Sequence, residues 1–240
     1  MAETETSHPD HLAHHFDSVE QQRESASFGM WLFIAQEIMF FGGLFLGYIV
    51  YRIKYPMAFA TGSNLLSIEW GAFNTAVLIG SSLTMALAVR AAQTGNNRLI
   101  IRWILATMLL GSVFLGVKVV EYKDKYDHQL VAGPMFEFDA DYVLEREAVP
   151  AVYADDIDVH DPQFGSNVHL FYSFYFVMTG MHALHMIIGI GVMIWLLVKA
   201  YRKRFGPDYY SPVEMTGLYW HFVDIVWIFL FPMLYLMGRH

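Results

Sequence analysis

Five long apolar stretches, separated by polar segments, dominate the sequence from residue 28 onwards. They cover approximately residues 28–51, 70–91, 99–120, 168–200 and 213–237. A helix of about 20 apolar residues crosses the hydrocarbon core of a bilayer, and each stretch reaches that length. The pattern therefore predicts an all-α fold, a polytopic membrane helix bundle with five transmembrane helices.

The composition supports a membrane protein. Hydrophobic residues make up 55% of the chain and charged residues only 16%, whereas about a quarter of a soluble protein is charged. The net charge of -8 describes the extramembrane segments, because the acidic residues concentrate there. The sequence contains no cysteine, which excludes disulfides, thiolate catalysis and cysteine-ligated metals.

Two polar regions flank or interrupt the predicted transmembrane domain, which covers residues 28–240. Residues 1–27 are expected to form a polar tail, and a solvated tail is favoured over a metal site for its histidines. We expect no signal peptide, because the first residues lack a basic and an apolar region. Residues 121–167 form an acidic loop. Its acids fit no EF-hand pattern, so a solvated, partner-facing loop is favoured over a calcium site. The residues behind these two alternatives are His8, His11, His14 and His15 in the tail, and Asp139, Asp141, Asp155, Asp156, Asp158 and Asp161 in the loop.

Five crossings place the two ends of the chain on opposite sides of the membrane. On the N-terminal side, lysine and arginine are concentrated in short loops, as in residues 199–204. Such loops face the cytoplasm. We therefore predict a cytoplasmic N-terminus, with the acidic loop and the C-terminus outside. Labelling of an Asp156→Cys variant only from the inside would contradict this orientation.

Several ionisable residues lie inside the apolar stretches, where they are expensive and usually functional. Glu37 stands in the first stretch, and His221 and Asp224 share one face of the last because they are three residues apart. Lys118 and Glu121 have the same spacing near the end of the third stretch. They could form an ion pair, or Lys118 could extend to the membrane interface.

Three histidines raise the possibility of a haem or metal site. His182 and His185 are three residues apart, and His221 lies on another predicted helix. Hydrogen bonding between helices is the favoured interpretation, because His185 has no acidic residue beside it on its own helix. A free-standing haem-b membrane protein is one alternative. A secondary transporter is a weaker one, because no internal repeat is visible.

The motifs resemble those of one family, subunit III of haem-copper cytochrome oxidases. Residues 219–230 (Tyr-Trp-His-Phe-Val-Asp-Ile-Val-Trp-Ile-Phe-Leu) are similar to its last helix, and residues 179–189 to its penultimate helix. Residues 33–41 resemble its carboxylate-bearing helix, with Glu37 on the signature glutamate. Residues 74–78 and the pair Glu121-Tyr122 match as well. Many members have seven helices, and this chain resembles a five-helix bacterial form.

The resemblance implies a non-catalytic subunit without a redox centre or metal of its own. Such a subunit packs against subunit I, which holds haem and copper, and binds phospholipids in a cleft between the first two helices and the rest. It supports sustained proton uptake in aerobic respiratory electron transport. No residue is expected to be catalytic. The residues expected to bind lipid or to make polar contacts between helices are Glu37, Asn74, His182, His185, Lys199, His221 and Asp224. Lys199 stands where many members carry an arginine, and lysine keeps the charge without the bidentate fork.

The implied complex is a proton-translocating cytochrome c oxidase in the bacterial inner membrane. Its partners for this chain would be subunit I directly, subunit II and other respiratory subunits, together with phospholipids but not nucleic acid. A subunit III of a quinol oxidase or nitric-oxide reductase complex remains an alternative. The helices do not separate these cases, because the electron donor binds elsewhere.

Overall fold

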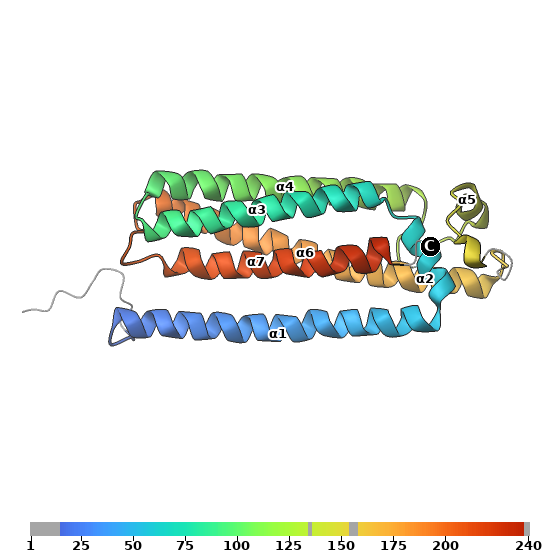
Figure 1. The fold of residues 1–240 in the computed structure, drawn as a ribbon, viewed down its shortest axis with the longest axis horizontal. Coiled ribbons are helices and arrows are strands. Elements are labelled where there is room, and N and C mark those ends of the chain that lie inside the picture. The colour runs from blue at the N-terminus through green and yellow to red at the C-terminus, as the bar shows by residue number, and fades with distance from the viewer. Residues whose placement is uncertain (1–14, 134–135, 154–157, 238–240) are drawn as a thin grey trace, which may run out of the picture.

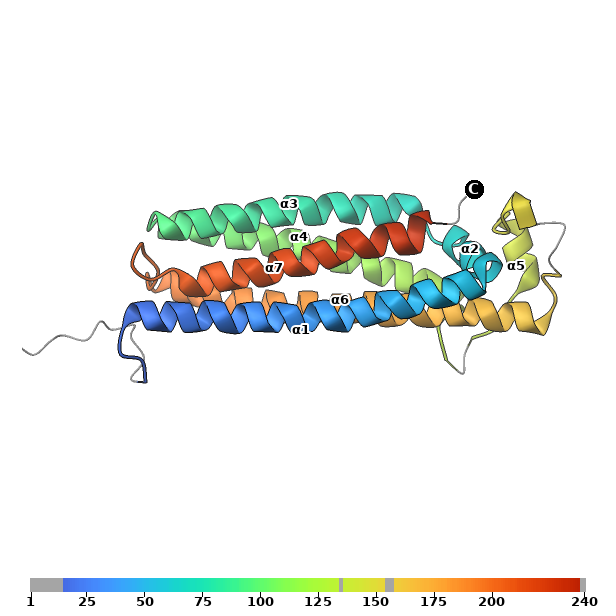
Figure 2. The same ribbon diagram turned by 60° about the horizontal axis from the view of Figure 1, so that its bottom comes forward.

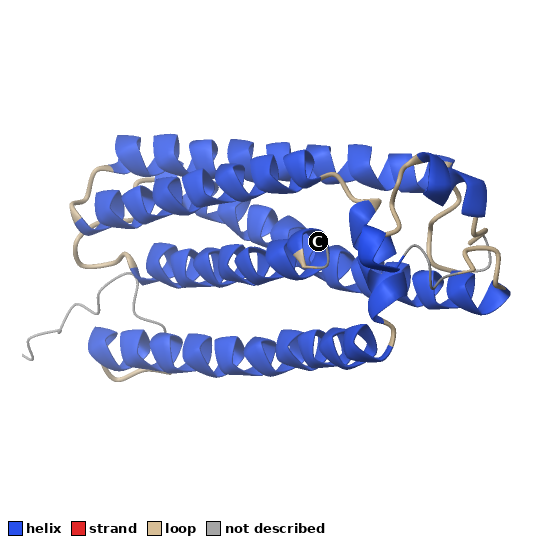
Figure 3. Ribbon diagram, turned by 45° about the vertical axis from the view of Figure 1, so that its right-hand side comes forward, coloured by secondary structure: helices blue, strands red, loops and turns tan. Residues whose placement is uncertain are grey.

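The computed structural model describes residues 15–133, 136–153 and 158–237. Five long helices run side by side along the length of the molecule (Figure 1). All five are long and apolar enough to cross a membrane, the last one together with its C-terminal extension η2 (Pro232–Leu236). The described residues contain no β-strand (Figure 3). The predicted all-α membrane bundle is thus confirmed, and the chain is a multi-pass membrane protein. The five helices are α1 (Val19–Lys54), α3 (Ile68–Gln93), α4 (Asn97–Asp127), α6 (Pro162–Tyr201) and α7 (Ser211–Phe231).

The helices extend beyond the apolar stretches seen in the sequence. α1 begins at Val19, inside the predicted polar tail, and Ser18 caps it by accepting a hydrogen bond from the Gln21 N–H. Asp161 caps α6 in the same way. Polar turns with such caps continue a helix into water, where hydropathy gives no signal. His8, His11, His14, Asp155, Asp156 and residues 238–240 lie outside the described residues.

Three short helical segments also occupy the connections. α2 (Pro56–Asn64) lies in the connection between α1 and α3, and most of it is buried. The acidic loop contains α5 (Ala140–Glu145) and a 3-10 turn at Ala151–Tyr153. Figures 1 and 2 show α2 and α5 at the same end of the bundle.

Trp220 of α7 is completely buried in the bundle. Gly111 of α4 and Gly189 of α6 make room for its indole, since a Cβ atom on either glycine would come within 2.9 Å or 2.8 Å of the ring. The indole Nε1 donates to Ser81 Oγ of α3 at 2.9 Å. Residues of α3, α4 and α6 therefore pack around one buried tryptophan of α7.

The arrangement of the helices corrects the predicted lipid cleft. α3 packs along α4 and α7, and α1 packs against α6 and α7 (Figure 1). The second span is therefore part of the main bundle, and the first two spans do not form a pair set apart from the rest. Gly217 of α7 favours this packing because its missing side chain admits Val89 of α3.

A proline reshapes the end of the last span. Pro232 has no N–H to donate, and the α-helix gives way there to the π-helical turn η2. Two carbonyl groups of this turn accept side-chain hydrogen bonds. Tyr48 of α1 donates to Met233 O at 2.7 Å, and Ser63 of α2 donates to Leu234 O at 2.8 Å. Backbone groups in a membrane need such partners, so α1 and α2 hold the turn in place.

Candidate functional site

A buried ion pair links three parts of the bundle. Lys118 is 2% exposed, and its ammonium donates to Glu121 Oε2 at 2.9 Å and to the Tyr175 and Tyr235 hydroxyls at 3.0 Å each. The Tyr235 hydroxyl donates to the other oxygen of Glu121 at 2.5 Å. All three N–H donors of the lysine are therefore used. We call Lys118, Glu121, Tyr175 and Tyr235 the Lys118 cluster.

Aromatic rings complete this cluster. The faces of Tyr122, Tyr175, Trp227 and Tyr235 lie 4.9–5.7 Å from the Lys118 nitrogen. Cation–π attraction of this kind strengthens when water is absent. Of the two arrangements open from the sequence, pairing with Glu121 is the one found. The two tyrosines were not expected, because no local sequence signal connects α6 or η2 to Lys118.

Glu37 and His185 form a second polar contact, between α1 and α6. His185 Nε2 lies 3.3 Å from Glu37 Oε2, and both side chains are about one-tenth exposed. His185 Nδ1 lies 2.8 Å from the Met181 carbonyl oxygen. A carbonyl only accepts, so Nδ1 carries a proton and Nε2 faces the carboxyl group. This polar contact joins the two helices.

His221 and Asp224 face α3 rather than α1. His221 Nδ1 lies 2.7 Å from Ser82 Oγ, a bond between α7 and α3. Both α7 residues line an otherwise apolar groove of about 480 Å³. Asp224 is 3% exposed, and neither of its oxygens has a hydrogen-bond partner among the described residues. Ser82 lies close to this carboxyl group. The Asp224 groove is defined by Leu78, Ile79, Ser82, Leu83, Ala86, His221, Asp224, Ile225 and Ile228.

The remaining predicted residues lie apart from these contacts. His182 is buried between the rings of Phe114 and Trp227, each with its centroid 5.3 Å away. Neither His182 nor Asn74 makes a side-chain hydrogen bond within the described part of the chain. The ammonium of Lys199, near the end of α6, lies 3.9 Å from the centre of the Trp195 ring. Among the predicted residues, Glu37 and His185 thus make a polar contact between helices and His221 makes a hydrogen bond to another helix. The described residues supply no side-chain hydrogen bond for His182, Asn74 or Asp224.

The three histidines considered for haem or metal face different neighbours. His185 faces α1, His182 packs against rings of α4 and α7, and His221 faces α3. Within residues 15–133, 136–153 and 158–237, no group of three or more histidine, aspartate or glutamate side chains is arranged to hold a metal ion. The described histidines therefore do not converge on a common ligand.

Comparison with known families decides the identity. The sequence model of the family described as cytochrome c oxidase subunit III matches residues 8–128 and 148–239. The chain belongs to the cytochrome c oxidase subunit III family. The resemblance inferred from the motifs is confirmed, and with it the function as subunit III of a haem-copper oxidase. Membership of this family also implies partner subunits and a role within an oxidase.

Individual relatives cover almost the whole chain. It is 26% identical to cytochrome bo(3) ubiquinol oxidase subunit 3 of Pseudomonas aeruginosa, over 95% of this chain and 92% of that protein. It is 28% identical to cytochrome c oxidase subunit 3 of Alkalihalophilus pseudofirmus, over 95% and 94% of the two chains. It is 29% identical to cytochrome c oxidase subunit 3 of Papio hamadryas, over 94% of this chain and 73% of the longer relative.

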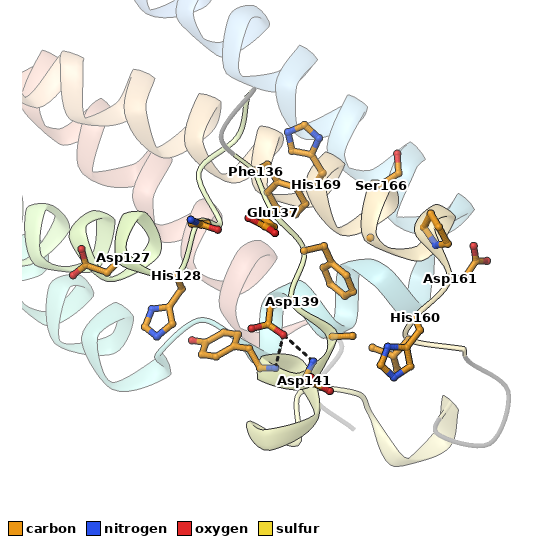
Figure 4. Close-up of a pocket in the computed structure, with 17 residues that line it drawn as sticks. Asp127, His128, Phe136, Glu137, Asp139, Asp141, His160, Asp161, Ser166 and His169 are labelled. Carbon is orange, nitrogen blue, oxygen red and sulfur yellow. Dashed lines mark hydrogen bonds between the residues drawn. The ribbon is translucent and has the colours of Figure 1, made fainter.

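One segment of this subunit III, residues 129–147, lies outside the family match. It helps to line an acidic pocket of about 930 Å³ at the end of the bundle (Figure 4). Figure 4 shows Asp139 accepting hydrogen bonds from the backbone N–H groups of Asp141 and Tyr142. The Gly133 N–H donates to His169 of α6 at 3.1 Å. This part of the acidic loop is therefore folded onto the start of α6, and its role in facing a partner remains a prediction.

Proposed function

We propose that this subunit III is a non-catalytic support of its oxidase and carries no redox centre of its own. It would pack directly against subunit I, which would hold the haem and copper. The observation that carries the proposal is that ionisable groups inside the spans make contacts between helices. The Lys118 cluster, the Glu37–His185 pair and the His221–Ser82 bond each join different helices. Polar groups that join helices in this way favour a structural role for the chain over a catalytic one.

The proposed support includes a bound phospholipid. An apolar hollow of about 230 Å³ lies between α1 and α7, next to the ring of Phe41. Phe41 in turn contacts His185, with ring centroids 5.4 Å apart. An acyl chain in this hollow would shield the Glu37–His185 pair from the membrane, and Lys199 would meet a headgroup nearer the end of α6. We propose that this lipid helps the complex to sustain proton uptake. The hollow is lined by Ile38, Phe41, Gly42, Phe45, Phe222, Ile225, Val226 and Phe229.

We also propose a bacterial cell membrane as the location, with the N-terminus in the cytoplasm. One end of the bundle carries the start of α1 and the short connections from α3 to α4 and from α6 to α7 (Figure 1). These connections and the adjoining helix ends are rich in lysine and arginine, whereas the opposite end carries the acidic loop. Short basic loops favour the cytoplasmic side. The basic residues are Arg90, Arg98, Arg102, Lys199, Arg202, Lys203 and Arg204.

The electron donor depends on the partner subunits. Similar proteins are named both as cytochrome c oxidase subunits and as quinol oxidase subunits. We propose cytochrome c as the donor, and a subunit II with a copper site in the purified complex would support this. A complex whose subunit II lacks copper would favour a quinol as the donor.

Purification of the tagged chain in mild detergent tests the proposal. We expect it to bring down a haem-copper subunit I and phospholipid, both identified by mass spectrometry. The chain separated from that complex should show no Soret absorption. A Soret band on the isolated chain that is lost in His221→Ala, but kept in the surface control His160→Ala, would contradict the proposal.

A further inference from the structure

The carboxyl group of Asp224, in the Asp224 groove, has no hydrogen-bond partner within the described part of the chain. Asp224 is 3% exposed and faces a groove with mostly apolar walls. Ser82 and His221, the other polar side chains of the groove, hydrogen-bond to each other at 2.7 Å. Both carboxyl oxygens of Asp224 lack a hydrogen-bond partner in the described residues. A carboxyl group in hydrocarbon is costly unless something hydrogen-bonds to it.

The depth of Asp224 limits what can approach it. The residue lies 13 positions after Ser211 and 12 before Leu236, the two ends of the last span. At 1.5 Å per residue, these separations correspond to about 20 Å and about 18 Å. Asp224 is therefore near the middle of the membrane, about 15 Å from the headgroups on either side. A phospholipid headgroup does not reach that depth, and an acyl chain has no donor to offer.

The shape of the groove matches a helix. Leu78, Ser82 and Ala86 follow one another at four-residue intervals along α3, and Asp224 and Ile228 do so along α7. Rows with this spacing form the ridges and grooves along which helices pack. The small side chains of Ser82 and Ala86 leave the space between the two rows open.

The walls of the groove face the membrane. Leu83 is 62% exposed and Ile225 is 50% exposed. Apolar side chains of this kind are as well suited to a neighbouring transmembrane helix as to lipid. Only the helix also brings a hydrogen-bond donor to the depth of Asp224.

We infer that the Asp224 groove seats a transmembrane helix of another subunit of the same oxidase, which donates a side-chain hydrogen bond to Asp224. The donor is a hydroxyl, amide or indole group, since these side chains join helices inside membranes. The inference rests on the proposed function, because it requires the chain to be packed within an oxidase complex. The inference specifies the surface at which one contact with another subunit forms, its depth in the membrane and the chemical groups that make it.

Photo-crosslinking in the assembled oxidase tests the inference. A photoreactive amino acid is placed at Ile228 or Leu83 in the groove, and at Leu109 of α4 as a lipid-facing comparison, 66% exposed. We expect Ile228 and Leu83 to give adducts with the same helix of one oxidase subunit, identified by mass spectrometry. An adduct with that same helix from Leu109 would overturn the inference, and so would adducts with lipid alone from both groove positions.

Substitution of the carboxyl group provides the second measurement. Asp224→Asn keeps an acceptor oxygen, whereas Asp224→Leu removes it and keeps the branching at Cγ. The Leu variant should lower the yield of the Ile228 adduct about threefold, the factor that corresponds to an interhelical hydrogen bond of average strength. The Asn variant should retain most of the yield, and an equal loss in both variants would overturn the role of the hydrogen bond.

The two proposals fail in different ways. If the tagged chain brings down no haem-copper subunit, the proposed function is wrong. If that subunit is present but the groove gives only lipid adducts, the inference about Asp224 alone is wrong.

Discussion

The Lys118 cluster and the Asp224 groove both place ionisable groups inside an apolar bundle, but they treat them in opposite ways. Lys118 is surrounded by three hydrogen-bond acceptors from α4, α6 and η2. Asp224 faces a groove open to the membrane and has no such partner among the described residues. A buried ionisable group can therefore stabilise the chain's own fold, as Lys118 does, or provide a contact for another molecule, as we propose for Asp224.

The surroundings of the Lys118 cluster are also more enclosed than those of the Asp224 groove. The Lys118 cluster is enclosed by aromatic rings on several helices. The Asp224 groove is walled by aliphatic residues that are about half exposed, such as Ile225. Enclosure removes water and strengthens every polar contact inside it. Loss of a partner should therefore be most damaging in the Lys118 cluster.

The largest expected effect follows from removing one partner of the buried ion pair. Lys118→Met leaves Glu121 buried without its cation, and we expect a loss of about 3–5 kcal/mol in the stability of the subunit. The midpoint of thermal denaturation of the purified oxidase in detergent, followed by loss of this subunit, measures the effect.

A double variant sharpens this prediction. Lys118→Met combined with Glu121→Leu removes both charges, and an apolar pair of similar volume is often as stable as a buried ion pair. The double variant should therefore be more stable than Lys118→Met alone. If it is less stable than both single variants, the hydrogen bonds of the two tyrosines matter more than the charge balance.

The second effect concerns the packing at Trp220, which lies on the same helix as Asp224. Gly189→Ala puts a methyl group within 2.8 Å of the indole ring, and such overpacking typically costs about 1–3 kcal/mol. Gly191→Ala is the matched control, because its added Cβ has no neighbour within 4 Å. Thermal denaturation should separate the two variants, and equal midpoints would show that the ring can move aside.

A smaller effect is expected at the Glu37–His185 pair. Glu37→Ala should weaken the attachment of α1 by about 1 kcal/mol, the usual size of one polar contact between side chains. The initial turnover of a fresh complex should stay close to normal, while phospholipid retention and activity over many turnovers decline. A double-mutant cycle with His185→Ala isolates the coupling between the two residues.

The exposed Glu24→Ala variant serves as the control for this experiment, because it lies on α1 outside the apolar stretch. An immediate loss of haem reduction in Glu37→Ala would contradict the supporting role. Complete additivity in the cycle would show that the observed 3.3 Å approach contributes no energy.

The smallest effect is expected at the membrane surface. Arg23 donates to the Tyr210 hydroxyl at 2.7 Å and lies 3.7 Å from Glu214, and its side chain is half exposed. Exposed ion pairs contribute about 0–1 kcal/mol and weaken with salt. Arg23→Ala should therefore lower the denaturation midpoint slightly at low salt and not at high salt. A loss as large as that of Lys118→Met would show that solvent does not screen this contact.

Much of the fold could be predicted from local patterns. Hydropathy predicted the five spans, because burial in lipid requires long apolar runs wherever the chain crosses. Segment α2 was missed, since Pro56–Asn64 is short and its burial depends on contacts with α6 rather than on its own composition. The lipid cleft was placed wrongly for a similar reason. Which helices lie side by side depends on fitted surfaces such as Gly217 against Val89.

The contacts of the candidate site also divide into those that local sequence predicts and those that depend on how the helices pack. By itself, the sequence determined the membrane class and the three-residue spacing that allows Lys118 to pair with Glu121, because these depend on composition and on neighbours along one helix. The family followed from the resemblance of its motifs. Only the tertiary structure decided that Tyr175 and Tyr235 complete that pair, that His185 meets Glu37, and that Asp224 is left facing a groove. Those contacts join residues far apart in the chain, and their geometry exists only after the helices have packed.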